Sequence, residues 1–94
     1  MTFIERIKQL RNECQLPQRK VAEALDIDSA TYCKIERGER KAKREQLVII
    51  AEILKADEKE LLALWLADQV TAVIADEKEL SNKVLDIAKQ NINE

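Results

Sequence analysis

A chain of 94 residues is long enough for one folded domain with a helical extension. Apolar residues make up 46% of the chain and charged residues 36%, whereas Gly and Pro occur once each. So few helix breakers among so many helix-forming residues favour an all-α fold and argue against a sheet-rich one. The formal net charge is only −2, so the distribution of charge along the chain is more informative than its total.

Membrane segments and metal sites are not expected. The longest wholly apolar run, residues 61–67, is too short to span a bilayer, and the charged N-terminus does not fit a signal peptide. We therefore expect a cytoplasmic protein with no membrane partner, in which Cys14 and Cys33 are reduced thiols. The chain has no His and no CxxC pair, so we expect no metal and no cofactor.

The two parts of the chain carry opposite charge. Residues 1–44 hold eleven Lys or Arg and seven acidic residues, a net charge of +4. Residues 45–94 hold five Lys and eleven acidic residues, a net charge of −6. This asymmetry is typical of a basic surface that binds a polyanion, followed by an acidic remainder. Solvated helix faces that simply differ in charge would produce the same numbers.

Two short helices are expected at the start of the chain. The first covers Phe3 to about Cys14, with apolar residues at helical spacing. Pro17 suits the first turn of a second helix, Gln18–Leu25, because its missing N–H has no partner there in any case.

A third helix, Ser29–Arg37, should follow closely and bury Tyr32 and Ile35. Asp28 is a good N-cap for it. Gly38, the only glycine, suits the left-handed position after its last turn. The segment from about Gln18 to Arg37 therefore reads as helix, turn, helix, and a basic loop with four cations in residues 40–44 comes next.

Three more helices are predicted over Arg44–Leu54, Glu58–Ile74 and about Glu77–Ile92. The first of these is apolar around most of its circumference, so its surplus surface must be covered by the next two helices, by a second subunit, or by both. The last two begin with the same residues, Ala-Asp-Glu-Lys-Glu-Leu, at 56–61 and 75–80. We expect each Asp to be an N-cap, with the Glu three positions later bonding back to it. The residues most readily assigned to the core here are Leu61, Leu62, Leu66 and Val70.

The order and spacing of several motifs indicate a family. They are Arg6-Ile7, Leu10-Arg11, Gln18, Val21-Ala22, Ile27, Ile35-Glu36-Arg37-Gly38, Leu47, Ile50-Ala51 and Leu54. With them, the stretch from Ile4 to Leu54 resembles the Cro and lambdoid-repressor type of helix-turn-helix, also called the XRE family. The resemblance implies a lambda-repressor-like domain over residues 1–56. Residues 57–94 would then add one or two helices for dimerisation.

The resemblance also assigns roles to particular residues. Arg11 and Glu36 would form a partly buried ion pair that supports the fold. Gln18 would be exposed, touch a phosphate and brace the third helix. Double-stranded DNA would be bound through this helix and its surroundings, by Gln18, Arg19, Ser29, Ala30, Thr31, Lys34, Arg37, Arg40, Lys41, Lys43 and Arg44. Ser29 and Ala30 would lie nearest the base edges, although small side chains read bases only lightly. The alternative is that Ser29 and Ala30 are simply solvent-exposed residues at the start of a helix.

Three positions depart from the family pattern. Pro17 stands where relatives usually have a small polar residue, which removes one expected phosphate contact. Gln15 replaces the glycine common after the first helix. Tyr32 replaces a smaller aliphatic residue, so we expect its hydroxyl to emerge beside the DNA-binding face.

The sequence therefore predicts a dimeric, sequence-specific regulator of transcription that binds a pseudo-palindromic operator, such as a restriction–modification controller or an autoregulator. The alternative is an antitoxin or accessory subunit whose C-terminal helices bind a protein partner. An enzyme is not expected, because no nucleophile with a base and no phosphate-binding loop can be identified, so no residue is assigned as catalytic. For the homodimer contact we expect Trp65, Leu80, Val84, Leu85, Ala88 and Ile92.

Overall fold

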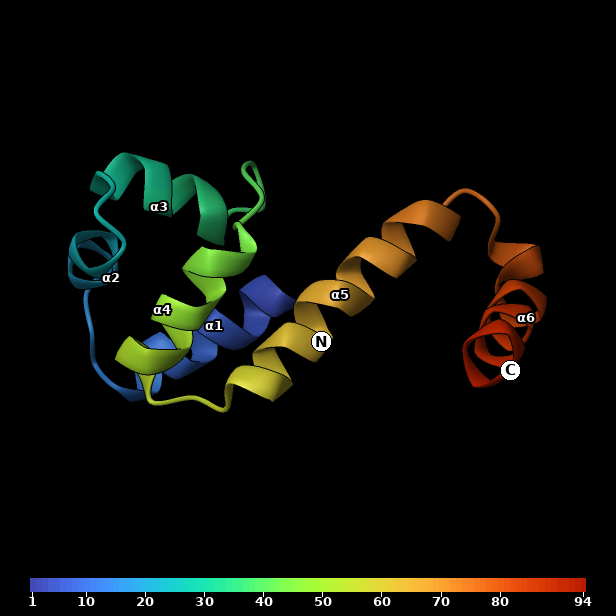
Figure 1. Cartoon of the computed structure of the whole chain (residues 1–94). Coiled ribbons are helices and arrows are strands. Elements are labelled where there is room, and N and C mark those ends of the chain that lie inside the picture. The colour runs from blue at the N-terminus through green and yellow to red at the C-terminus, as the bar shows by residue number, and fades with distance from the viewer.

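The computed structural model describes residues 1–94 and contains only helices. This confirms the all-α fold class and the expected order of elements. The elements are α1 (Phe3–Glu13), α2 (Gln18–Ala24), α3 (Ser29–Glu36), α4 (Arg44–Leu54), α5 (Glu58–Ile74), a short 3₁₀ helix η1 (Lys78–Leu80) and α6 (Ser81–Asn93). Helices α1 to α4 form a compact body with the first half of α5, and the rest of α5 carries α6 away from it (Figure 1).

One core holds the body together. Residues from all of the first five helices and from the loop before α4 are buried in it: Phe3, Ile7, Val21, Ala22, Leu25, Tyr32, Ile35, Ala42, Leu47, Ile50, Ala51, Leu54 and Leu61. Helix α4 runs through the middle of this body and contacts α1, α2 and α5. Ala22, on α2, is 1% exposed within this core, so a larger side chain there would strain the packing of α2 on its neighbours.

Four helices end in the same way, each with one left-handed residue. After α3 this residue is Gly38 (φ 78°), as expected, but after α1, α2 and α4 it is Gln15, Asp26 and Lys55, with φ of 54–57°. In each case the following backbone N–H reaches the carbonyl five residues back, as Leu16 does to Arg11 at 3.0 Å. Such a closure satisfies the last carbonyls of a helix. Three of the four positions hold residues that pay a steric cost for this backbone.

The repeated segments do not start their helices in the expected way. Asp57 does cap α5, accepting the backbone N–H of Lys59 at 3.0 Å. Glu60 does not bond back to it, because its carboxylate pairs with Arg6 on α1. The second copy makes no side-chain cap at all: η1 precedes α6, and Leu80 occupies the N-cap position of α6. The prediction of two capping boxes was therefore wrong. In the first copy Glu60 pairs with Arg6, and in the second copy the 3₁₀ helix η1 precedes α6.

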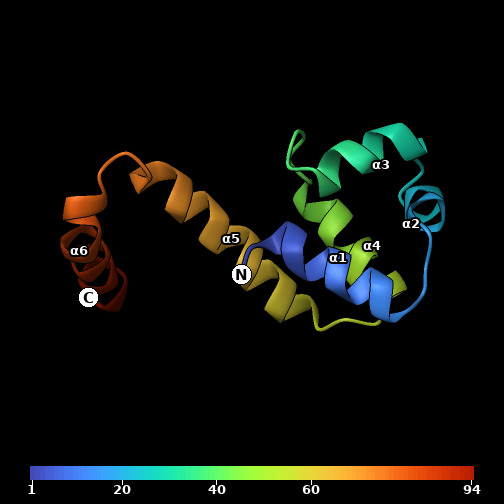
Figure 2. The same ribbon diagram turned by 180° about the vertical axis from the view of Figure 1, so that it is seen from behind.

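Helix α6 covers none of the apolar surface of α4. Ile49 and Ile53 pack against the core, and α5 is the C-terminal helix that contacts α4. Seen from both sides, α6 stands well apart from α1 to α4 (Figures 1 and 2). Of the alternatives considered for covering α4, the structure shows α5 in this place within the chain and not α6. Leu66 and Val70, expected in the core, are 43% and 48% exposed.

Candidate nucleic-acid interface

Helices α2 and α3 are joined by a tight turn and pack directly on each other. The turn depends on Asp26, whose left-handed backbone lets the Ile27 N–H reach the Ala22 carbonyl at 3.0 Å. Tyr32 and Ile35 fix the inner face of α3 in the core. The outer face of α3 is consequently held at the surface of the body.

The first turn of α3 is capped and open to solvent. The backbone N–H of Thr31 donates to the Asp28 carboxylate at 2.7 Å, and hydrogen bonding by Thr31 lowers the pKa of Asp28 below its usual value. Ser29 and Ala30 are exposed and Thr31 is half-buried. Lys34, one turn further on, is exposed too. The expected base-reading positions therefore lie on one accessible stretch of helix.

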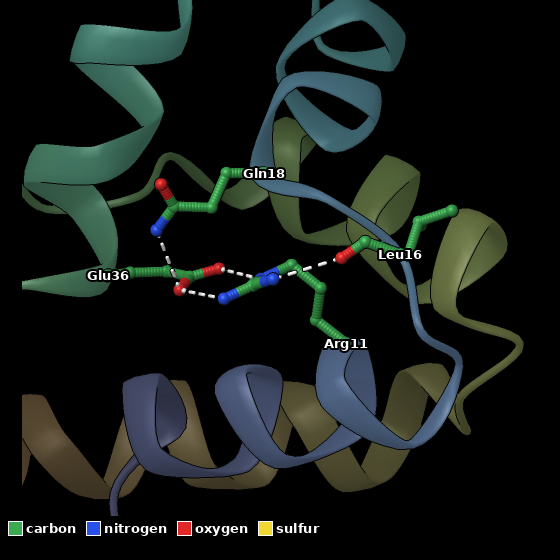
Figure 3. Close-up of polar contacts among 4 residues, drawn as sticks. All are labelled: Arg11, Leu16, Gln18 and Glu36. Carbon is green, nitrogen blue, oxygen red and sulfur yellow. Dashed lines mark hydrogen bonds and ion pairs between the residues drawn. The ribbon is translucent and has the colours of Figure 1, made fainter.

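A buried ion pair locks the end of α3 to α1. Arg11 Nε donates to Glu36 Oε2 at 2.7 Å and Arg11 Nη2 donates to Oε1 at 3.0 Å, while Nη1 donates to the Leu16 carbonyl at 2.9 Å (Figure 3). The Glu36 side chain is only 2% exposed. This bidentate geometry is the strongest that a guanidinium and a carboxylate can form. The carbonyl of Leu16 is an additional acceptor for Arg11, and no sequence motif predicts it.

Gln18 completes this network and is half-buried, not exposed as expected. Its Nε2 donates to Glu36 Oε1 at 3.1 Å (Figure 3). Burial by itself raises the pKa of Glu36, but the hydrogen bond from Arg11 and the polar groups of Tyr32 and Gln18 outweigh it and hold that pKa below its usual value. Glu36 is thus an ionised acceptor that ties α1, α2 and α3 together at one point.

Residues 3–64 match the family model of the helix-turn-helix domain. The chain belongs to this helix-turn-helix family. The match spans well over half of the sequence and supports a DNA-binding regulator. No match was found among curated proteins or among solved structures. No helix of this protein is both long and apolar enough to cross a membrane.

The hydroxyl of Tyr32 does not emerge beside the expected DNA-binding face, contrary to expectation. Tyr32 is 0% exposed, and its hydroxyl makes no hydrogen bond although it lies beside Arg11 and Glu36. Burial, followed by the neighbouring Glu36, raises the pKa of Tyr32. The ring of Tyr32 therefore belongs to the core instead of the surface.

The cations that follow α3 are not equivalent. Arg40, Lys43 and Arg44 are exposed and form no ion pair. Lys41 is instead turned toward α5, where its Nζ donates to Gln69 Oε1 at 2.9 Å and lies 5.1 Å from the centroid of the Trp65 ring. Arg40, Lys43 and Arg44 therefore have no ionic partner within the chain, whereas Lys41 donates one ammonium hydrogen to α5.

Two further cations flank this surface. Arg19, on α2, is exposed and unpaired. Arg37 closes α3 and lies 3.4 Å from Glu39, with both side chains more than half exposed. A pair that exposed is weak, so Arg37 can exchange Glu39 for a phosphate at little cost.

Trp65, expected at a dimer contact, has its own role within the domain. Its Nε1 donates to the Ala42 carbonyl at 2.9 Å, and its ring packs against the core. The other residues expected there lie on η1 or α6 and are exposed: Leu80, Val84, Leu85, Ala88 and Ile92. Spacing alone could not separate these cases, because apolar residues recur at helical spacing both around Trp65 and along α6.

Proposed function

We propose that this protein is a sequence-specific transcriptional regulator of the Cro and lambdoid-repressor type that binds a pseudo-palindromic operator as a homodimer. Restriction–modification controllers and autoregulators act in this way. The observation that carries the proposal is the exposed outer face of α3, fixed on a buried ion pair and followed by three free cations. A rigid helix that projects from its support is what entry into a major groove requires.

In this proposal α3 is the recognition helix and enters the major groove with its first turn foremost. Ser29 and Ala30 meet base edges, Thr31 stands beside them, and Lys34 reaches a guanine or a phosphate. Few donors point at the bases, so the shape and deformability of the operator contribute to specificity.

The phosphates on either side of the groove are bound by cations and by one amide. The cations are Arg19, Arg37, Arg40, Lys43 and Arg44. Gln18 takes part through the second hydrogen of its Nε2, since Glu36 accepts only one. Lys41 is left out of this set because its ammonium group is turned toward α5. Such contacts supply affinity and register rather than sequence information.

The proposed dimer contact is the arm formed by the second half of α5, η1 and α6. Large apolar side chains are exposed along it: Leu66, Val70, Val73, Leu80, Val84, Leu85, Ile87 and Ile92, with exposed fractions of 37–83%. A two-helix arm with this much exposed apolar surface has no core of its own. Two arms that pack about a two-fold axis would cover it.

In this proposal a second copy of the chain covers the apolar arm. Binding to a palindrome requires two recognition helices about 34 Å apart on successive turns of one DNA face, and a dimer supplies them. The arm projects from the side of the body formed by α5, away from α2 and α3 (Figures 1 and 2). Dimerisation there would leave both recognition helices free. The compact unit in this arrangement extends into α5, since Leu61 is 0% exposed.

The dimer is tested by replacing one apolar residue of the arm. Val84→Glu should convert a dimer into a monomer in sedimentation and lower operator affinity by about a hundredfold or more, because one half-site cannot supply the binding energy of two. Asn82→Glu introduces the same carboxylate elsewhere on α6 and should stay dimeric. A wild-type protein that is monomeric at all concentrations yet protects a full palindrome would contradict the proposal.

The DNA surface is tested separately, beginning with a footprint on the DNA upstream of the protein's own gene. Arg40→Ala and Lys43→Ala should each weaken binding to all sequences and reduce the salt dependence by about one phosphate contact. Lys59→Ala removes an exposed cation from α5 and should change nothing. A larger residue at Ala30 should change which operators are bound. Equal loss on every sequence would refute a base-reading role for Ala30.

The second candidate function is an antitoxin or accessory subunit. The same exposed apolar arm favours it, because a different protein could cover that surface. In that case the purified chain would aggregate or stay monomeric until it is co-expressed with the product of a neighbouring gene, and Val84→Glu would abolish capture of that product.

A further inference from the structure

A cavity of about 360 Å³ lies between the start of α1, the loop after α3 and one face of α5. Cavities of this size bind small molecules in many proteins. Its walls are mostly apolar, contributed by Phe3, Ile4, Ala42, Trp65 and Ala72. Of its lining residues, only Arg40 also belongs to the proposed DNA contact.

The charges around this cavity are unequal. Two cations line it, Arg40 and Lys41, against one acid, Asp68. Asp68 already has a partner, since its Oδ2 accepts the backbone N–H of Phe3 at 3.0 Å. Lys41 is held at the rim by Trp65 and Gln69, while Arg40 has no ion pair within the chain. A complementary ligand therefore has an apolar body and one negative group.

We propose that this cavity binds a small amphipathic carboxylate, whose apolar body packs on Phe3 and Trp65 and whose carboxylate meets Arg40 and Lys41. Arg40 belongs both to this cavity and to the proposed phosphate contacts. The ligand and DNA then compete for one guanidinium, so the carboxylate weakens DNA binding and DNA weakens carboxylate binding by the same factor. This second step rests on the proposed function, whereas ligand binding itself does not.

Ligand binding can be measured without DNA because Trp65 is the only tryptophan of the chain. Its indole Nε1–H therefore gives a single, assigned NMR signal from a residue that lines the cavity. Full-length protein is titrated with 3-phenylpropanoate, 2-naphthoate and octanoate at millimolar concentrations, and with 3-phenylpropanamide as the uncharged counterpart of the first. At least one acid should shift the indole signal in a saturable way, and the amide should bind several-fold more weakly.

Variants separate this cavity from general attraction of anions. Arg40→Gln should weaken the binding of the acid about fivefold, the effect of one partly exposed charge contact, and leave the binding of the amide unchanged. Ala72→Phe fills the cavity from an exposed position on α5 and should abolish the shift. Arg44→Ala removes a cation from the same segment outside the cavity and should bind the acid as the wild type does.

Four results would overturn the proposal: no indole shift with any of the three acids, equal affinity for the acid and the amide, shifts confined to α6, or an indole signal that moves with protein concentration alone. The last would mean that a second copy fills the cavity. The competition is then measured by adding the bound acid to the DNA complex, where operator affinity should fall several-fold for the wild type and remain unchanged for Ala72→Phe. If the protein binds the acid but binds no DNA, the proposed function is disproved and the assignment of the cavity still holds.

Discussion

The buried ion pair between Arg11 and Glu36 allows a quantitative prediction about stability. Replacing Arg11 by Met removes three hydrogen bonds, two to Glu36 and one to the Leu16 carbonyl, while keeping most of the apolar stem. Glu36 is then left with Gln18 as its only hydrogen-bond donor of good geometry, at 3.1 Å. Its side chain is 2% exposed, so water cannot replace the guanidinium.

The expected loss follows from this burial. Removing one partner of a fully buried pair costs about 3–5 kcal/mol. The Arg11 side chain is 16% exposed, so we expect the lower end, about 3 kcal/mol. For a domain of this size a loss of that magnitude lowers the melting temperature by about 12–24 °C. Replacing both Arg11 and Glu36 by Met should restore most of the stability, because no charge is then stranded.

Urea unfolding followed by far-UV circular dichroism measures these differences. The pair between Arg6 and Glu60 is a matched control, because it starts on the same helix and has a similar distance, 2.8 Å. Its side chains are 25% and 47% exposed, so Arg6→Met should cost less than about 1 kcal/mol. Equal losses in the two variants would refute the argument from burial.

The pH dependence gives the loss a second signature. In the wild type the pKa of Glu36 is lowered on folding, so its contribution is present above the usual carboxyl pKa and disappears as the pH falls through the lowered value. Without Arg11, burial dominates and raises the pKa of Glu36 above the usual value. The variant then recovers stability as the pH falls through that raised value. A deficit that stays constant from about pH 7 to pH 5 would contradict this account.

Three further substitutions test other features of the fold by the same unfolding measurement. Gln15→Gly relieves a left-handed residue (φ 54°) and should stabilise the protein by about 0.5–1 kcal/mol, whereas Asn12→Gly, inside α1, should destabilise it by about as much. A loss from Gln15→Gly would mean that the side chain has a role that outweighs its backbone strain. Tyr32→Phe removes a buried hydroxyl that makes no hydrogen bond and should leave stability unchanged or raise it by about 1 kcal/mol; a clear loss would reveal a bond to the neighbouring ion pair. Trp65→Phe removes the hydrogen bond to the Ala42 carbonyl and should cost about 1 kcal/mol or more without changing the oligomeric state, and a change of oligomeric state would return Trp65 to the subunit contact.

Much of the helical layout is local and could be predicted. The beginnings of α3, α4 and α5 follow from cap residues, spacing and the loop before them, and Gly38 follows from the backbone that ends α3. Local sequence signals were less reliable for helix ends and caps, because different residue types can form the same turn or cap. The left-handed positions at Asp26 and Lys55 carry no glycine, and the repeat at 75–80 lacks the cap that its twin at 56–61 supports.

The sequence by itself determined the helices, the basic first part and the short exposed turn at Ser29 and Ala30, because propensity, capping and charge act between near neighbours. Only the tertiary structure decided how far the core extends along α5, where Leu61 is buried and Val70 is exposed. The physical reason is that periodicity defines an apolar face but not the length of the surface that covers it. For the same reason Gln18 and Tyr32 turned inward to the ion pair, Lys41 turned to Trp65, and α6 was left with an apolar face that the chain itself does not cover.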